Sequence, residues 1–135
     1  MVKINVDYQG DLHCKVTHGP SGNVLLTDAP VDNNGKGEYF SPTDMLAGAV
    51  GACISTILGM WAKRENVDLS GLNIEITKEM AANPRRIGKL YLKMDVPCKL
   101  DDKQKDIFKN VIKTCPVAQS LRTDLEIITE YNFAV

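Results

Sequence analysis

Alternating apolar and polar residues mark the first part of the chain as a set of half-buried strands. The alternation runs through residues 2–8, resumes over residues 12–16 after a turn at residues 9–11, and returns in a short run at residues 23–27. Two alternating runs joined by a tight turn are typical of a hairpin. The sequence therefore predicts a β-hairpin followed by a third strand.

A polar loop and a long helix follow these strands. Residues 28–40 are rich in Asn and Gly, and loops of this length often carry or cover a functional site. Ser41 is a good N-cap, Pro42 suits the first helical position, and Asp44 completes a variant of the capping box. The helix is expected to run from there to about Glu65.

The second half of the chain predicts further strands and one amphipathic helix. Apolar spacing indicates two strands, a helix, a short helix after a proline and a last strand, over residues 72–76, 90–96, 101–113, 116–121 and 125–133. The order β-β-β-α-β-β-α-β indicates an α+β fold in mixed layers, not an alternating βαβ nucleotide-binding fold. The chain of 135 residues shows no repeat, so one domain over residues 1–135 is expected.

The long helix has two faces that both favour burial. Small residues recur at every fourth position along one edge, at Ala47, Gly51, Ser55 and Gly59. The opposite stripe is apolar, with Trp61 beside it, and consists of Leu46, Val50, Cys53, Ile57 and Met60. Because small residues let another backbone approach closely, a second copy of the chain is one candidate for covering the helix. The chain's own sheet and second helix are the other.

The uncharged run over residues 45–62 also resembles a short membrane-spanning segment. Its 18 residues lie at the lower limit for a helix that crosses a bilayer. A helix that is apolar on every side also suits the centre of a globular core. We expect the second arrangement and no membrane partner.

Composition and charge narrow the choice of partners and location. The chain is 44% hydrophobic and 24% charged, its formal net charge is −1, and its basic residues form no block. This balance gives no general attraction to nucleic acid. The first residues lack the apolar core of a secretory signal, so a cytoplasmic location with reduced thiols is expected. The four cysteines include no CxxC pair and do not predict a zinc knuckle.

Cys53 and Cys115 are the candidate catalytic residues. Cys53 lies mid-helix among apolar neighbours, where most cysteines are inert core residues. Cys115 follows the apolar stripe of the second helix and precedes Pro116, so it lies at the start of a new helical turn, where a thiolate is favoured. Both thiols face the core from helices that should pack together. If they approach each other, they form a peroxidatic and resolving pair.

The other candidate residues have structural explanations. Cys14 and Cys98 lie on strand patterns, and Cys98 is expected to be partly exposed at a strand end. His13 and His18 lie five residues apart across a predicted turn and do not suggest a metal-binding pair. The Arg pair at residues 85–86 suits a solvated hairpin better than an anion site. No metal and no cofactor are expected.

Residues 41–53, with the sequence Ser-Pro-Thr-Asp-Met-Leu-Ala-Gly-Ala-Val-Gly-Ala-Cys, are followed much later by Cys115-Pro116-Val117. Together these motifs resemble the OsmC/Ohr family of osmotically induced and organic-hydroperoxide-resistance proteins. The order of strands and helices fits the same family over nearly the whole chain. The resemblance implies an α+β OsmC-like fold in which antiparallel sheets wrap around two long central helices of an intertwined homodimer.

The resemblance also implies thiol-dependent reduction of organic hydroperoxides as an oxidative-stress defence. By motif position Cys53 is the peroxidatic thiol, which becomes a sulfenic acid, and Cys115 is the resolving thiol, which closes the Cys53–Cys115 disulfide. An outside dithiol reductant then reopens that disulfide. Thr43 and Asp44 are supporting residues, because Thr43 stands where active members have Glu and Asp44 supplies an acid one residue later. Capping is the simpler explanation of Asp44.

The sequence also departs from the family in the positively charged residue that stabilises the thiolate. Active members place an Arg in the N-terminal half to stabilise the thiolate, and the first Arg here is Arg64. Lys is a point charge and cannot make the paired, planar contacts of Arg. Two alternatives therefore stand beside the peroxidase. One is a non-catalytic OsmC-like protein that binds a small apolar ligand at the dimer interface, and the other is a thiol-redox sensor that forms a disulfide without turnover.

Overall fold

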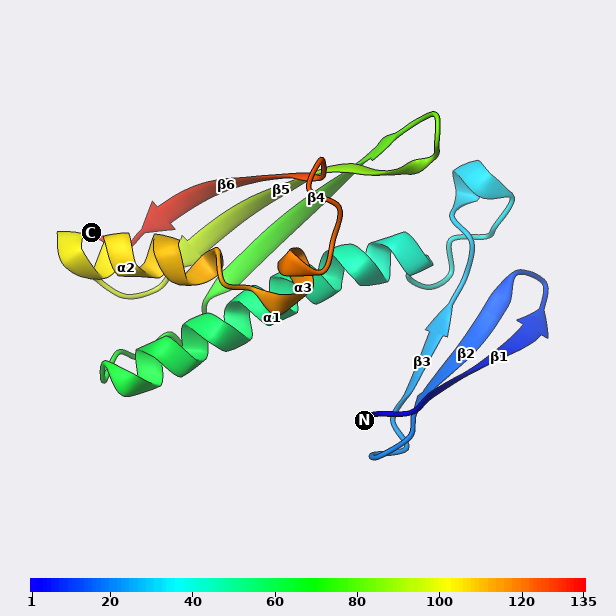
Figure 1. The fold of residues 1–135 in the computed structure, drawn as a ribbon, viewed down its shortest axis with the longest axis horizontal. Helices are drawn as coiled ribbons and strands as arrows, with labels where there is room; N and C mark the ends of the chain where they lie inside the picture. Colours follow the sequence, from blue (N-terminus) through cyan, green and yellow to red (C-terminus); the bar gives the residue numbers. More distant parts are fainter. The chain divides into compact units, whose positions relative to one another are not determined.

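The computed structural model describes residues 1–135, and the chain divides into two compact units. The first unit covers Met1–Leu46 and the second covers Ala47–Val135. The helix α1, Pro42–Arg64, runs through the boundary between them without a break (Figure 1). The assignment of one domain to residues 1–135 stays a prediction.

The first unit is a three-stranded antiparallel sheet followed by a long loop. Strand β1, Ile4–Gly10, pairs with β2, His13–His18, and β2 pairs with β3, Val24–Thr27. The predicted hairpin and third strand are therefore confirmed. The loop after β3 contains the short 3₁₀ helix η1, Val31–Asn33, and its last residue forms a bridge with the end of β3.

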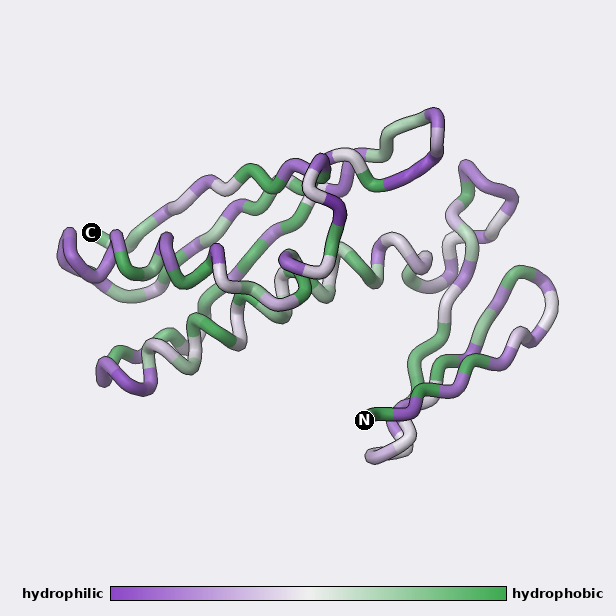
Figure 2. Tube along the Cα trace, in the orientation of Figure 1, coloured by the Kyte–Doolittle hydropathy of each residue, from purple (hydrophilic) through white to green (hydrophobic).

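One face of this first sheet is apolar and uncovered within the chain. Ile4, Val6 and Tyr8 alternate along β1 and are 60–66% exposed. The strand register puts Val16 and Leu25 on the same face. Figure 2 shows the alternation along β1 as green and purple segments. The buried residues of this unit are all polar, namely Thr27, Asp28 and Ser41.

The start of α1 is built as the sequence predicts. The Ser41 N–H donates to Asp44 Oδ2 at 3.0 Å, and the Asp44 N–H donates to the Ser41 hydroxyl at 3.1 Å. These reciprocal bonds form a capping box and satisfy N–H groups that a helix start leaves without intrahelical partners. The predicted N-cap and the capping role of Asp44 are therefore confirmed.

The second unit packs the rest of α1 against three strands and two shorter helices. Strand β4, Asn73–Ala81, is antiparallel to β5, Arg86–Val96, and β5 is parallel to β6, Glu126–Phe133. Helices α2, Asp102–Ile112, and α3, Pro116–Gln119, lie in the connection between β5 and β6. A parallel neighbour requires a long crossover of this kind. The prediction of purely antiparallel sheets is therefore wrong for this sheet, which is mixed.

Helices α1 and α2 cover one face of the β4–β6 sheet (Figure 1). Along β5, Leu90, Leu92 and Met94 are each at most 1% exposed, while the residues between them face solvent. Phe108 of α2 is fully buried and meets Trp61 of α1 edge-on, with 6.0 Å between ring centroids. This unit therefore has an apolar core of its own, and the stripe predicted for the second helix contributes to it.

The buried side of α1 differs from the predicted one. The buried residues that follow its first turn are Ala47, Val50, Gly51, Ile54, Leu58, Trp61 and Ala62. Leu46 and Met60, which were expected in the core, are exposed. Gly51 lies against β4, where an added Cβ would come within 2.5 Å of Ile76 Cδ1, so the chain's own sheet covers part of the small-residue edge. Ala47, Val50, Gly51 and Trp61 are buried as predicted, and the prediction was wrong for Leu46 and Met60 because a helix that is apolar on every side has no periodicity to fix its rotation.

The exposed side of α1 is small and uncharged. Its small residues are Gly48, Ala49, Ala52, Thr56 and Gly59, and the exposed Leu46 and Met60 lie among them, before the basic last turn of the helix. A Cβ added at either glycine would meet nothing within 4 Å. By length and composition α1 is able to cross a membrane, but the core helix of a soluble protein passes the same test. The absence of a membrane partner stays a prediction.

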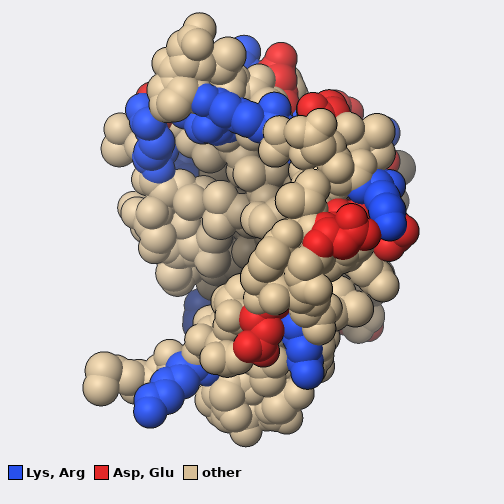
Figure 3. Space-filling model, turned by 90° about the vertical axis from the view of Figure 1, so that its right-hand side faces the viewer, with Lys and Arg blue, Asp and Glu red and all other residues tan.

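Charged residues of both signs share the molecular surface. On the face drawn in Figure 3, several Lys and Arg side chains gather near the top, and side chains of both signs lie next to one another lower down. The formal net charge is only −1. The absence of a nucleic-acid partner stays a prediction.

Candidate functional site

Cys53 and Cys115, the two candidate catalytic residues, come together in the second unit. Cys53 lies in the middle of α1, is partly exposed and packs against the apolar core. Cys115 lies immediately before α3 and is fully buried. Both are free thiols. The structure therefore places the two sulfurs at different depths of the same core.

Cys115 is held at a break between two helices. Helix α2 ends at Ile112, and Pro116, which cannot continue a helix, opens α3 at its first position. The Ala118 N–H donates to Cys115 Sγ at 3.5 Å. This is an N-cap bond in which sulfur takes the place of the usual oxygen. The predicted location of Cys115 at a helix start is confirmed.

The two thiols are close enough for Cys53 to affect the pKa of Cys115. Burial raises the pKa of Cys115 above its ordinary value of 9.0; the Ala118 N–H opposes this shift, and the hydrogen bond and charge of Cys53 add to it. Cys115 is therefore protonated at neutral pH. A buried, protonated thiol therefore stands near a partly exposed sulfur.

Thr43 and Asp44, the predicted supporting residues, lie in the first turn of α1. The Asp44 carboxylate takes part in the capping box, and the Thr43 hydroxyl lies 3.2 Å from the Ser41 hydroxyl. Asp44 precedes Cys53 by about 2.5 helical turns at 3.6 residues per turn. These contacts stabilise the helix start, and a supporting role in catalysis stays a prediction.

A cavity of about 360 Å³ adjoins the segment that holds the buried thiol. Its lining is mostly apolar and includes Ile54 of α1 and Ala118, whose N–H bonds Cys115. Lys109 and Lys113, both exposed, also belong to the lining. A larger cavity of about 600 Å³ lies between the second half of α1 and the loop before β4, and neither cavity has a cysteine in its lining. The smaller cavity is the candidate for binding a substrate, because Ile54 follows Cys53 in α1 and the Ala118 N–H bonds Cys115.

The other cysteines and the Arg pair have structural surroundings. Cys14 and Cys98 are partly buried free thiols, and burial raises the pKa of Cys98. The partial exposure predicted for Cys98 is confirmed. Arg86 Nη1 donates to the backbone carbonyls of Ala82 and Pro84, which closes the turn between β4 and β5. This contact fits the hairpin role predicted for the pair.

The two histidines do not straddle a turn, as was expected, but lie at the two ends of β2. His18 Nδ1 lies 2.6 Å from the Ser21 hydroxyl. His13 instead faces Asp28 and Glu38, two residues that the sequence did not single out. They escaped notice because they lie in a loop far along the chain from His13, and no local spacing connects them. The one available signal was the density of Gly and Asn residues that folds this loop tightly.

Comparison with known proteins identifies the family of the chain. The family model described as OsmC-like protein matches residues 35–130. No protein with a curated description matches the chain. Among solved structures, the chain is similar to a protein from Psychrobacter arcticus 273-4 described as an osmotic stress induced and detoxification response protein. The two are 44% identical, the match covers 98% of this chain and 96% of that one, and the TM-score is 0.94.

Two more distant structures share the fold. An organic hydroperoxide resistance protein OsmC from Legionella pneumophila is 12% identical, with a TM-score of 0.79 over 98% of this chain and 96% of that one. An organic hydroperoxide resistance protein from Elizabethkingia anophelis is 14% identical, with a TM-score of 0.77 over 99% and 98% of the two chains. At these identities the likeness extends to the fold alone.

Proposed function

The chain belongs to the OsmC-like protein family, and from this premise we propose that it is a thiol-dependent peroxidase that reduces organic hydroperoxides. The observation that carries the proposal is the thiol pair, with Cys53 partly exposed and Cys115 buried close enough for the two to interact. A peroxidatic thiol must be reached by the peroxide, and a resolving thiol must lie beside it. The exposed sulfur suits the first role and the buried sulfur suits the second.

In the first step the Cys53 thiolate attacks the terminal oxygen of the hydroperoxide. A sulfur–oxygen bond forms, the oxygen–oxygen bond breaks, and the leaving alkoxide takes a proton from water to become the alcohol. The sulfur loses two electrons and becomes a sulfenic acid, while the peroxide is reduced. Because burial raises the pKa of Cys115, this neighbouring thiol stays protonated and neutral during the step.

In the second step Cys115 attacks the sulfur of the Cys53 sulfenic acid. A disulfide forms, the sulfur–oxygen bond breaks, and the Cys115 proton leaves with the hydroxide as water. The Ala118 N–H stabilises the negative charge that develops on Cys115 during this transfer. The buried thiol thus stays protonated until the sulfenic acid is present.

The third step returns the enzyme to its reduced form. A dithiol reductant attacks the Cys53–Cys115 disulfide, passes through a mixed disulfide, and leaves as its own disulfide with both cysteines protonated again. Such a reductant is maintained in a reducing compartment. A cytoplasmic location is therefore part of the proposal.

The lining of the smaller cavity supports an organic hydroperoxide as the substrate. Its walls are mainly apolar, while Lys109 and Lys113 offer positive charge. An apolar substituent on the peroxide gains free energy on leaving water for such a wall, which hydrogen peroxide cannot do. We expect the ratio kcat/KM to rise with the size of the apolar group.

A homodimer is a further part of the proposal. The β1–β3 sheet leaves Ile4, Val6 and Tyr8 largely exposed, and α1 leaves its small, uncharged side uncovered. Exposed apolar areas of this kind mark interaction surfaces. A second copy of the chain supplies complementary apolar cover, as the family resemblance implies.

The proposed function is tested by the consumption of cumene hydroperoxide with dithiothreitol as reductant. The reduced protein should consume the hydroperoxide catalytically, and Cys53→Ser should lower the rate to background. Cys115→Ser should retain the first step and accumulate a sulfenic acid on Cys53, which dimedone labels. Cys98→Ser, a change at another partly buried thiol, should retain full turnover and is the matched control.

Two results would decide against the peroxidase. Turnover that survives Cys53→Ser would show that the thiol pair is not the site. A reduced protein that binds an apolar ligand stoichiometrically but consumes no hydroperoxide would instead support the non-catalytic binding protein.

A further inference from the structure

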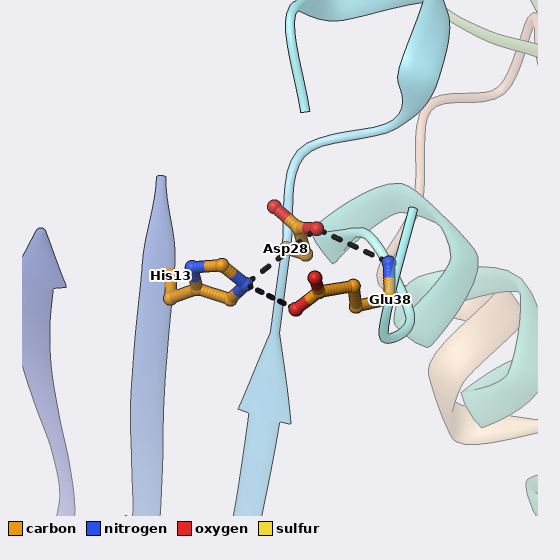
Figure 4. A group of neighbouring side chains, drawn as sticks. All are labelled: His13, Asp28 and Glu38. Carbon is orange, nitrogen blue, oxygen red and sulfur yellow. Dashed lines mark hydrogen bonds and ion pairs between the residues drawn. The ribbon is translucent and has the colours of Figure 1, made fainter. Parts of the chain in front are cut away.

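A second cluster of chemically active side chains lies in the first unit. It is distant in sequence from Cys53 and Cys115, and it contains an imidazole and two carboxylates instead of thiols. His13 comes from the start of β2, Asp28 follows β3 directly, and Glu38 lies near the end of the loop (Figure 4). His13 Nε2 lies 3.6 Å from Asp28 Oδ2 and 3.3 Å from Glu38 Oε2. Three segments that are separate in sequence therefore converge on one imidazole nitrogen.

Asp28 is fixed by the loop and withdrawn from water. Its side chain is 0% exposed, and Oδ2 accepts the backbone N–H groups of Lys36 at 3.2 Å and Glu38 at 3.1 Å. The loop reaches this position only with glycine at residue 35, because a Cβ on Gly35 would lie 1.7 Å from the carbonyl oxygen of Ala29. The other carboxylate oxygen, Oδ1, is buried and accepts no hydrogen bond.

His13 meets the two carboxylates through ion-pair contacts only. Its Nε2 is shielded from water, lies between the two carboxylates and forms no hydrogen bond (Figure 4). Tyr39 meets the imidazole edge-on, with 5.8 Å between ring centroids, and restrains its orientation. Buried polar atoms without hydrogen bonds are rare in native proteins and call for a missing partner.

The charge of the cluster indicates that this partner is a cation. Two carboxylates, one of them fully buried, face a single imidazole. The nearby ammonium of Lys36 is directed to Asp11, with 2.9 Å between Nζ and Oδ2. Buried carboxylates are paired with cations or coordinate metals, because an uncompensated buried charge is very costly.

The geometry and the donor types together point to a metal ion. We propose that His13, Asp28 and Glu38 form a site for a divalent transition-metal ion, best suited to Zn²⁺. The three donor atoms all lie within 4.8 Å of one another. Donors bound at about 2.0–2.1 Å in tetrahedral geometry are about 3.4 Å apart, which the observed separations of 3.3 and 3.6 Å approach.

The remaining position of this site opens to solvent through a cavity. The cavity has a volume of about 320 Å³, and its lining includes His13 and Glu38 together with Asp11 and Tyr39. Three protein ligands and one open position are typical of zinc sites that hold water or a small substrate. The cavity also provides the entry path that a metal ion requires.

The metal site is tested by calorimetric titration of ZnCl₂ into the full chain carrying Cys53→Ser and Cys115→Ser, which removes binding by the thiol pair. We expect one Zn²⁺ per chain, bound at least tenfold more weakly after Glu38→Gln or His13→Gln. Glu38 is half exposed, so its substitution leaves the fold intact. His18→Gln, at the other end of the same strand, is the matched control and should bind as the parent does.

Co²⁺ provides an independent readout of the ligand types. Its visible absorption should show ligand-field bands without a thiolate charge-transfer band, and Glu38→Gln should remove them. The proposal is overturned if no Zn²⁺ binds, or if Glu38→Gln and His13→Gln both bind it as tightly as the parent. In the first case the cluster is a metal-free ion-pair triad, with imidazolium between two carboxylates.

Discussion

The two sheets of this protein differ in how their apolar residues are covered. In the β4–β6 sheet, α1 and α2 cover one face, and Leu90, Leu92 and Met94 are removed from water. In the β1–β3 sheet the corresponding face remains open within the chain, with Ile4 and Val6 exposed. The buried residues of that first unit are polar and belong to its loop and helix cap.

This difference shows that the two units obtain their order from different interactions. The second unit has a hydrophobic core and follows the usual rule for a stable small domain. The first unit is organised by hydrogen bonds and by the His13 cluster, and its apolar face is available to a partner. The chemistry divides in the same way, with thiols in the core and carboxylates and imidazole in the loop unit.

Substitution of the central core residue should have the largest effect. Phe108→Ala removes a fully buried ring that contacts Trp61 and Phe133. We expect the free energy of unfolding to fall by about 3–5 kcal/mol, measured by urea denaturation. Ile128→Ala, on the solvent-exposed face of the β4–β6 sheet, is the control and should cost less than about 1 kcal/mol. Equal losses of unfolding free energy in the two variants would mean that burial of Phe108 in the core does not stabilise the second unit.

A charge on the open apolar face should separate the chains of a dimer. Val6→Lys puts an ammonium in the centre of the exposed apolar face of β1. We expect the dimer dissociation constant, measured by analytical ultracentrifugation, to rise at least tenfold, which is about 1.4 kcal/mol. Asn5→Lys adds the same charge to the other face of the strand and should leave the constant nearly unchanged. A monomeric parent protein would contradict the role assigned to this face.

The close approach of α1 and β4 predicts a coupling between two core residues. Gly51→Ala forces Ile76 Cδ1 to move, and Ile76→Val removes that carbon atom. Each change alone should destabilise the second unit by about 1 kcal/mol. Because the second change relieves the clash made by the first, the double variant should cost less than the sum. Additive losses in urea denaturation would show that helix and strand do not touch there.

The pKa of the buried thiol predicts the smallest effect, a loss of stability at high pH. The folded-state pKa of Cys115 is raised, so above 9.0 the unfolded chain ionises this thiol before the folded chain does. The free energy of unfolding should therefore fall as pH rises through that region. Cys115→Ser should flatten this part of the profile. If the free energy of unfolding of Cys115→Ser falls with pH as steeply as that of the parent, the effect comes from another group.

Local features of the fold were readable from the sequence. The Ser41–Asp44 capping box and the break at Pro116 depend on neighbouring residues alone, and the structure has both. The alternating strands also lie within a few residues of their predicted positions. Such local patterns indicate which side chains are buried and which backbone conformation each residue favours.

Features that depend on distant segments were not readable. The rotation of α1 was wrong because all its sides are apolar, and the parallel pairing of β6 has no local signature. The approach of Cys53 to Cys115 was expected only because each cysteine lies on an apolar helix stripe that was predicted to face the same core. The cluster of Asp28 and Glu38 around His13 was missed, since only the folded loop brings these residues together.

The parallel pairing of β5 with β6 also affects the order in which the protein folds. Asp95 and Asn132, which are paired across these strands, are 37 residues apart, whereas β4 and β5 are joined by a tight turn. Closing the longer loop costs more chain entropy, so the β4–β5 hairpin forms early and β6 docks late. Cys115 lies within that late-closing segment. A newly made chain therefore brings Cys53 and Cys115 together only near the end of folding.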